Sequence, residues 1–299
     1  MFFEKGEDMK QIIEASEMPL NADGSIYHLR LQPDQLAPNV ILVGDPGRVP
    51  VVSRHFDRVD VKVQNRELVT HTGVLNGTPI TVLSTGMGTD NIDIVLNELD
   101  ALVNVDLKNR VRKDTHTSLN LVRLGTSGSF QAEYEVDTFC ASQYGLGFDG
   151  LLNYYVVPEN LYEKDMMQAF DAHMKLPSDF AHPYIVACSQ DLMDKVGFDM
   201  HKGITATAPG FFAPQGRVVN LPLRFPEQNE RLETFDYKGN RISNMEMETS
   251  ALYGLGRAMG HRCLTVCVLI ANRRTMTFSK DYHPHVDALI EVVTERLTK

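Results

Sequence analysis

Apolar residues along the chain gather in short continuous runs that lead into polar, glycine-containing segments. The runs from Asn39 to Val43, Ile80 to Leu83, Leu119 to Leu124 and Cys263 to Ala271 each predict a strand. Continuous apolar runs, as opposed to alternating ones, are typical of strands that are covered on both faces.

Amphipathic helical patterns separate these runs. One follows Gly88, and two others are predicted from about Pro158 to Lys175 and from Val286 to Leu297. A further helix ends near Gly260, where a C-cap is expected, and its apolar face comprises Met247, Ala251, Leu252, Leu255 and Met259. Alternating strands and helices predict an α/β fold with a mixed, mostly parallel central sheet flanked by helices.

The domain organisation expected from this pattern is simple. Residues 1–25 are charged and mixed in character, and we expect an N-terminal arm outside the core. Residues 26–299 show no internal repeat and no low-complexity linker, so we expect a single α/β domain.

Composition narrows the classes of function. The formal net charge of −10 argues against a nucleic-acid partner but allows a small anion held by a few arginines. The apolar runs are too short to cross a bilayer, and residues 1–8 lack the features of a secretory signal. The four cysteines have no zinc-site spacing. We therefore expect a cytoplasmic protein with reduced thiols, no membrane partner and no metal.

Three of the predicted strands end in glycine-rich segments, at 44–48, 86–88 and 125–128. Ligands gather at the carboxyl ends of parallel strands, and glycine lets backbone N–H groups approach an anion closely. Arg48 and Arg123 lie in or beside these segments and carry donors suited to phosphate. The dinucleotide fingerprint and the P-loop motif are absent, which ranks a nicotinamide-dependent dehydrogenase low.

Two carboxylates precede the helix that ends near Gly260. In extended chain Glu246 and Glu248 share a face, and a helix start beside Glu248 keeps its carboxylate ionised. An ionised carboxylate accepts two hydrogen bonds at once, as a pair of vicinal sugar hydroxyls requires. The alternative is that acidic residues simply favour a first helical turn.

These motifs carry a resemblance. From about His28 to the C-terminus the chain resembles the nucleoside phosphorylase superfamily (NP-I type) of the uridine phosphorylase kind. The resemblance rests on segments 44–48, 84–88, 123–128 and 245–248, in the family's order and at about its spacing. It implies a pentosyltransferase of nucleotide salvage that uses inorganic phosphate as co-substrate.

Position by position, the resemblance implies a site shared between subunits. The phosphate-binding positions match Gly44, Arg48, Arg66, Arg123 and Thr126, and the ribose-binding positions match His28, Glu246, Met247, Glu248 and Thr126. In the family, the counterparts of Arg66 and His28 reach into the neighbouring subunit's site. The resemblance therefore implies a homo-oligomer, either a dimer or a trimer of dimers.

The predicted base-binding residues are Phe211, Gln215, Arg217 and Gly128. The uridine-specific branch of the family has Phe-x-x-x-Gln-x-Arg, which Phe211, Gln215 and Arg217 match. Gln215 offers an acceptor and a donor for N3–H and one carbonyl of uracil, and Arg217 can face the other carbonyl. The expected substrate is uridine, with deoxyuridine and thymidine left open.

Two alternatives stay open on the same scaffold: a purine nucleoside phosphorylase or a nucleosidase that uses water, and a non-catalytic nucleoside-binding homologue. Purine-cleaving relatives carry Ser-Asp where this chain has Asn272 and Arg273, and asparagine cannot protonate a purine. Some relatives bind a monovalent cation between subunits near Glu67, Met87 and Asn91. Asn91 replaces a serine there, so the resemblance does not decide that ion.

The expected mechanism is attack of phosphate on C1′ of an oxocarbenium-like ribose. Its catalytic residues are Arg123, which holds phosphate, Glu248, which holds the ribose, and Gln215 with Arg217, which stabilise the departing uracil anion. The mechanism as expected requires neither a covalent nucleophile nor a metal.

Overall fold

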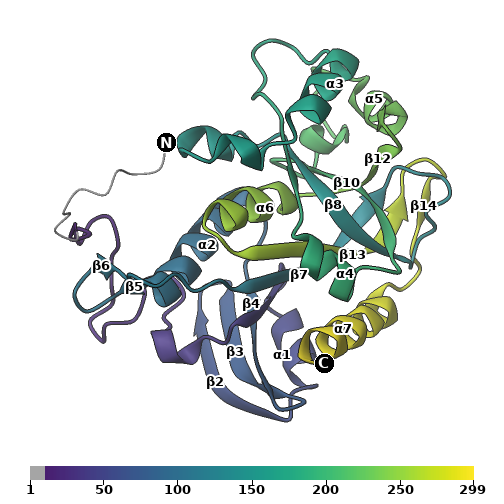
Figure 1. Cartoon of the computed structure of the whole chain (residues 1–299). Coiled ribbons are helices and arrows are strands. Elements are labelled where there is room, and N and C mark those ends of the chain that lie inside the picture. The colour runs from purple at the N-terminus through teal and green to yellow at the C-terminus, as the bar shows by residue number, and fades with distance from the viewer. Residues whose placement is uncertain (1–10) are drawn as a thin grey trace.

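A twelve-stranded sheet runs through the molecule in this computed structural model, which describes residues 11–299 (Figure 1). Its strands are β1 (Asn39–Val43), β2 (Arg58–Asn65), β3 (Leu68–Leu75), β4 (Thr78–Ser84), β7 (Asn120–Ser129), β8 (Phe139–Gly147), β9 (Tyr184–Ala187), β10 (His201–Thr207), β11 (Asp236–Tyr237), β12 (Asn240–Glu246), β13 (Arg262–Asn272) and β14 (Thr277–Phe278). Strands β5 (Val105–Asp106) and β6 (Val111–Arg112) form a separate hairpin.

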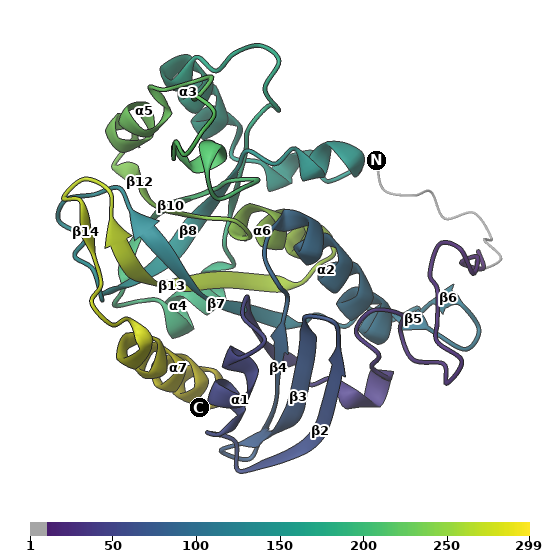
Figure 2. The same ribbon diagram turned by 180° about the vertical axis from the view of Figure 1, so that it is seen from behind.

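The helices cover this sheet on both sides. They are α1 (Arg48–Ser53), α2 (Thr89–Asn104), α3 (Lys164–Met174), α4 (Gln190–Val196), α5 (Gln228–Thr234), α6 (Thr249–Ala258) and α7 (His283–Thr298). Helices α2 and α6 lie side by side across one face, and α7 packs near α1 and α4 on the other (Figures 1 and 2). The helix predicted from Pro158 begins later, at Lys164, after a short 3₁₀ turn.

Parallel pairing is confined to two groups of strands. Strands β4, β1, β7 and β13 are parallel neighbours, and so are β8, β10 and β12. Antiparallel pairings join the two groups and add β2, β3, β9, β11 and β14. The prediction of a mixed sheet between helices is confirmed, and its parallel part is central.

One part of the sheet closes on itself. Strand β12 pairs with β7 as well as with β10, so β7, β12, β10, β8 and β13 form a small barrel. Helix α6 packs against the β8, β10 and β13 strands of this barrel. Both carboxylates singled out in the sequence lie where β12 ends and α6 begins.

The prediction that the third strand stops at Leu124 and turns into a glycine loop is wrong. Strand β7 continues through residues 125–129, because these residues pair with β13 on one side and partly with β12 on the other. Gly125 serves a different purpose, since a Cβ atom there would lie 2.2 Å from Nη1 of Arg123. The glycine makes room for a guanidinium and not for a turn.

The N-terminal segment lies partly against the domain. Residues 1–10 of the expected arm lie outside the described residues. In the described remainder, Met18 is buried in the main core, and the N–H of Ile13 donates to the carbonyl of Arg110. Among the described helices, none combines the length and apolarity needed to span a membrane.

Candidate active site

The centre of the candidate site is a buried arginine held by two carboxylates. Arg123 projects from β7 and is 5% exposed. Its Nη2 pairs with Glu248, and its Nη1 lies 3.2 Å from Oε2 of Glu246. The two carboxylates raise the pKa of Arg123 despite the opposing effect of burial, so the guanidinium stays charged.

Glu246 is engaged inside the protein. Its carboxylate accepts hydrogen bonds from the Thr207 hydroxyl and from the backbone N–H groups of Glu248 and Thr249. These bonds satisfy N–H groups at the start of α6, as a helix cap does. Burial raises the pKa of Glu246, and the positive charge of Arg123 opposes that shift. Its surroundings are those of a structural acid.

Glu248 joins three elements at one point. It stands at the start of α6 and pairs through Oε2 with Arg123 of β7, while Oε1 accepts the N–H of Gly88 at 2.8 Å. Gly88 precedes α2 and has a φ of 94°, which favours glycine. Met247 beside it is half-buried. The second glycine-rich segment and the helix start therefore meet at this carboxylate.

The first glycine-rich segment brings a second arginine to the same place. Nη1 of Arg48 donates to the carbonyl of Leu124, next to Arg123, at 3.3 Å. Burial and the charge of Arg123 lower the pKa of Arg48. Gly44 follows β1 and lies against the second segment, since a Cβ there would lie 3.4 Å from the carbonyl of Gly86. Thr126 lies half-buried in β7.

Two predicted residues lie elsewhere on the chain. His28 is fixed by Glu98 of α2, which accepts its backbone N–H at 2.9 Å and contacts Nδ1 at 2.7 Å. Arg66 is exposed in the turn between β2 and β3, and neighbouring Asn65 donates to the carbonyl of His28 at 2.8 Å. The structure therefore brings His28 and the Arg66 turn together.

The predicted base-binding segment folds as a compact turn. Arg217 donates to the carbonyl of Phe211 and to Oε1 of Gln215, both at 2.6 Å. Its guanidinium carbon lies 3.8 Å above the centre of the Phe211 ring. Gln215 is 4% exposed whereas Phe211 is 52% exposed. Desolvation lowers the pKa of Arg217.

Arg273 is a site residue that the sequence analysis noted only as a replacement. It follows β13 and donates to the carbonyl of Gln215 at 2.6 Å and to its Oε1 at 3.2 Å. A Cβ at Gly128 would lie 3.5 Å from its Nε. Burial and the charge of Arg217 lower the pKa of Arg273 to about 10. Two arginines thus converge on Gln215, beside Gly128 of β7.

The side chain of Asn272 is held by hydrogen bonds within the protein. Its amide nitrogen donates to the carbonyls of Gln131 and Tyr134, and its Oδ1 accepts the N–H groups of Arg274 and Thr275. Its side-chain amide thus joins the turn that follows β13 to the connection between β7 and β8. A proton donor for a purine base does not stand at this position.

Placing an acid at position 272 is expected to damage the fold without creating purine cleavage. Asn272→Asp places carboxylate oxygens against two carbonyls, so the free energy of unfolding should fall by about 2 kcal/mol. Denaturant unfolding and an inosine cleavage assay check this, with exposed Asn160→Asp as control. Inosine cleavage gained by a fully stable variant would contradict the structural role.

The residues near the cation position of some relatives also lie together. Nδ2 of Asn91 donates to Oε1 of Glu67 at 3.3 Å, beside Gly86, and Met87 is 75% exposed. At the position where some relatives bind a cation, this chain therefore places the amide nitrogen of Asn91 against the carboxylate of Glu67.

In the described part of the chain, Asp100, His116 and His261 lie near enough to share a metal ion. However, Nδ1 of His261 accepts the N–H of Leu119 at 3.2 Å, so its Nε2 carries the proton and faces Asp100 at 3.3 Å. A metal-bound histidine normally donates through its second nitrogen, which this one cannot do. The geometry is that of an Asp–His pair.

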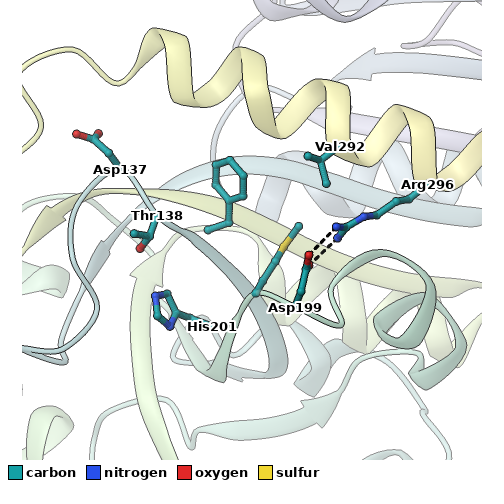
Figure 3. A pocket seen from close by; sticks show the side chains of 8 residues that line it. Asp137, Thr138, Asp199, His201, Val292 and Arg296 are labelled. Atoms are coloured by element: carbon teal, nitrogen blue, oxygen red, sulfur yellow. Dashed lines mark hydrogen bonds and ion pairs between the residues drawn. The ribbon is translucent and has the colours of Figure 1, made fainter.

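A hollow of about 400 Å³ lies beside α7 and the first residues of β8 and β10 (Figure 3). Arg296 and Asp199 form a two-pronged ion pair along it, with both contacts at 2.7 Å. His201 and Phe139 line it as well. It shares no lining residue with the site around Arg123 and Gln215.

Comparisons with known proteins agree with this geometry. A family model described as "Phosphorylase superfamily" matches residues 38–297. A uridine phosphorylase from Thermococcus kodakarensis is 30% identical over 266 residues, covering 89% of this chain and 84% of that protein. A Trypanosoma brucei nucleoside phosphorylase, whose structure is described as showing uridine phosphorylase activity, aligns with a TM-score of 0.82 at 28% identity, covering 94% of this chain and 99% of that one.

A Phytophthora capsici uridine phosphorylase structure shares the fold, with a TM-score of 0.68 at 21% identity over 97% of this chain and 99% of that one. The family match covers the three glycine-rich segments, the Arg123–Glu248 pair and the Gln215 turn together. By sequence and by architecture, this chain belongs to the phosphorylase superfamily.

Proposed function

We propose that this chain is a uridine phosphorylase, which converts uridine and inorganic phosphate reversibly into uracil and α-ribose 1-phosphate. The observation that carries the proposal is the convergence of Arg217 and Arg273 on Gln215. Uracil leaves with negative charge on its carbonyl oxygens, and two guanidinium groups beside an amide suit that anion. Donors placed where charge develops stabilise the transition state more than the substrate.

The phosphate half of the site is the neighbourhood of Arg48 and Arg123. The Arg48 guanidinium contacts the carbonyl of Leu124, that of Arg123 lies beside Gly125, and the backbones of Gly44 and Gly86 lie close to each other. Phosphate held here would attack C1′ of a ribose that Glu248 orients through its 2′- and 3′-hydroxyls. Positioning both reactants in one site supplies much of the rate enhancement that such a reaction needs.

We propose that two chains share each site. Glu98, which fixes His28, stands nine residues beyond Thr89 in α2, about 13 Å from the Gly88 end of the helix. His28 is therefore too far along α2 to serve the Glu248 of its own chain, and Asn65, next to Arg66, contacts it. A partner subunit could receive both residues at once. The chain would then act as a dimer or a trimer of dimers.

We place the enzyme in the cytoplasm, in nucleotide salvage. All four cysteines are free and buried, as is typical of proteins from reducing compartments. The substrates proposed here are small metabolites of that compartment.

The experiment that tests the function is uracil release from uridine with and without phosphate. Release that requires phosphate supports a phosphorylase, and release in water alone would make the chain a nucleosidase. Inosine in place of uridine separates the purine alternative. Failure to cleave either nucleoside would leave a non-catalytic homologue, and deoxyuridine and thymidine then define the sugar and base tolerance of an active enzyme.

Glu248→Gln is expected to lower kcat/KM for uridine more than for deoxyuridine. The variant loses the charge that accepts hydrogen bonds from both ribose hydroxyls, and deoxyuridine lacks one of them. We expect about a tenfold larger loss on uridine, because hydrogen bonds to charged groups are the stronger kind. Equal losses on both substrates would refute contact with the diol.

A further inference from the structure

The interior of the small barrel is polar where apolar side chains would be expected. Ser127, Ser142, Thr205 and Asn244 are all buried, with at most 5% of their surface exposed. Burying polar groups costs free energy unless they are hydrogen-bonded to one another. A fully connected polar network in a core also fixes side chains in one arrangement.

Asn244 of β12 is the centre of this network. Its Oδ1 accepts the hydroxyls of Thr205 at 2.7 Å and Ser243 at 2.8 Å. Its Nδ2 donates to Oγ of Ser127 at 2.7 Å, and Thr205 continues the network to Ser142. In this orientation the amide oxygen faces the hydroxyls of Thr205 and Ser243, and the amide nitrogen faces Ser127.

The network reaches the candidate site through Cys267. Ser127 lies on the same face of β7 as Gly125, and Gly125 pairs with Cys267 of β13, so Ser127 and Cys267 are diagonal neighbours across the two strands. Sγ of Cys267 in turn lies 3.8 Å from Nη1 of Arg123. The Cys267 sulfur borders the space in which the guanidinium lies, and Gly125 leaves that space open because it has no Cβ.

The orientation of the Arg123 guanidinium is set by the contacts of its two Nη groups. Its Nε is buried and has no hydrogen-bond partner within the described chain, so the Nη groups alone set the plane of the guanidinium. Glu246 and Glu248, at the end of β12 and the start of α6, form ion pairs with those Nη groups. Cys267 is the residue of β13 that contacts Nη1.

We propose that Asn244, acting through Ser127 and Cys267, is a positioning residue that aims the Arg123 guanidinium at the anion. The identity of the anion as phosphate rests on the function proposed above. The residue touches no substrate itself. It orders a series of neighbouring side chains that ends on the phosphate arginine, and small displacements of such a group are costly to the reaction.

The test compares Cys267→Val, Cys267→Ser and Asn244→Leu with the wild type. Phosphate KM, uridine KM and kcat are measured together with the phosphate Kd from calorimetry. Cys267→Val and Asn244→Leu should each raise the phosphate KM and Kd about tenfold, whereas the uridine KM changes less than about twofold. Cys267→Ser keeps a hydrogen-bonding atom and should restore most of the phosphate affinity.

Thr81→Val is the matched control. Thr81 is a fully buried residue of β4 whose Oγ1 accepts the N–H of Ala37, outside the barrel. It should lower the melting temperature and leave the phosphate KM unchanged. If Asn244→Leu does not fold, Ser127→Ala interrupts the same series with a smaller change of volume and should also raise the phosphate KM.

Two results would overturn the positioning role: unchanged phosphate affinity in Cys267→Val and in the Asn244 or Ser127 variant, or an equal loss in Thr81→Val. A wild type that neither binds phosphate nor requires it for uracil release would overturn the proposed function as well. That failure is visible in the wild type alone, so the two failures are distinguishable.

Discussion

Arg123→Ala is expected to abolish phosphate-dependent uracil release and to destabilise the fold. The substitution removes the positive charge that pairs with both Glu246 and Glu248, each of which is at most 5% exposed. Removing one partner of a buried ion pair leaves uncompensated charge and typically costs about 3–5 kcal/mol. Calorimetric or denaturant unfolding, together with the uridine assay, measures both effects.

The control for this variant is Arg58→Ala. Arg58 forms an exposed pair with Asp60 on β2, and exposed pairs contribute about 0–1 kcal/mol. It should leave both stability and rate near wild type. An Arg123→Ala protein that unfolds like the wild type would show that the two carboxylates take up protons or rearrange without cost, contrary to the buried network described above.

The variant Arg123→Lys separates the two roles of the residue. A lysine keeps the charge near the carboxylates but cannot present the flat, forked donors of a guanidinium. Stability should therefore recover in part, while phosphate-dependent turnover stays low. Recovery of both would mean that charge alone, without the guanidinium geometry, is sufficient at this position.

The fold could be predicted largely from periodicity because its central strands are continuous apolar runs. Strand β1 has the predicted bounds, and β4 and β13 differ by at most two residues at an end. The strand predicted from Leu119 to Leu124 is shorter than β7 because a glycine in the sequence usually indicates the end of a strand. Its glycines are instead paired in a barrel and shaped by Arg123, a tertiary effect that no local pattern contains.

For the candidate site, the sequence predicted some of the residues that the structure brings together and missed others. Motif positions supplied Arg48, Arg123 and Glu248, and the structure brings these three together. Arg273 was missed as a partner of Gln215 because the two lie 58 positions apart and meet only through the ends of different strands. The signal available in the sequence was an arginine directly after the last strand, at the edge where ligands gather.

Glu246 and Glu248 lie two residues apart and both pair with Arg123, but their other partners differ. Two carboxylates two residues apart share a face in extended chain, which suggested that both face a sugar. The chain leaves β12 and enters α6 between them, so Glu246 turns toward Thr207 and the N–H groups of the helix start. Only the change from strand to helix distinguishes the two, and its position within a residue is beyond sequence periodicity.

Arg217→Ala is expected to lower kcat/KM for uridine by about 10²–10³, the loss typical of removing one donor to a developing anion. Arg217 is partly exposed and holds Phe211 and Gln215 rather than the core, so the melting temperature should change little. The rate loss should appear mainly in kcat, because uracil carries its charge only as the bond breaks.

Arg224→Ala is the matched control for this variant, since Arg224 follows in the same connection and pairs with exposed Asp179. Arg273→Ala should resemble Arg217→Ala, and the double variant should lose less than the product of the two losses because both arginines act on one amide. Independent, multiplying losses would mean that Arg217 and Arg273 serve different groups. A wild-type rate in Arg217→Ala would remove that residue from the mechanism and place the uracil anion against Arg273 alone.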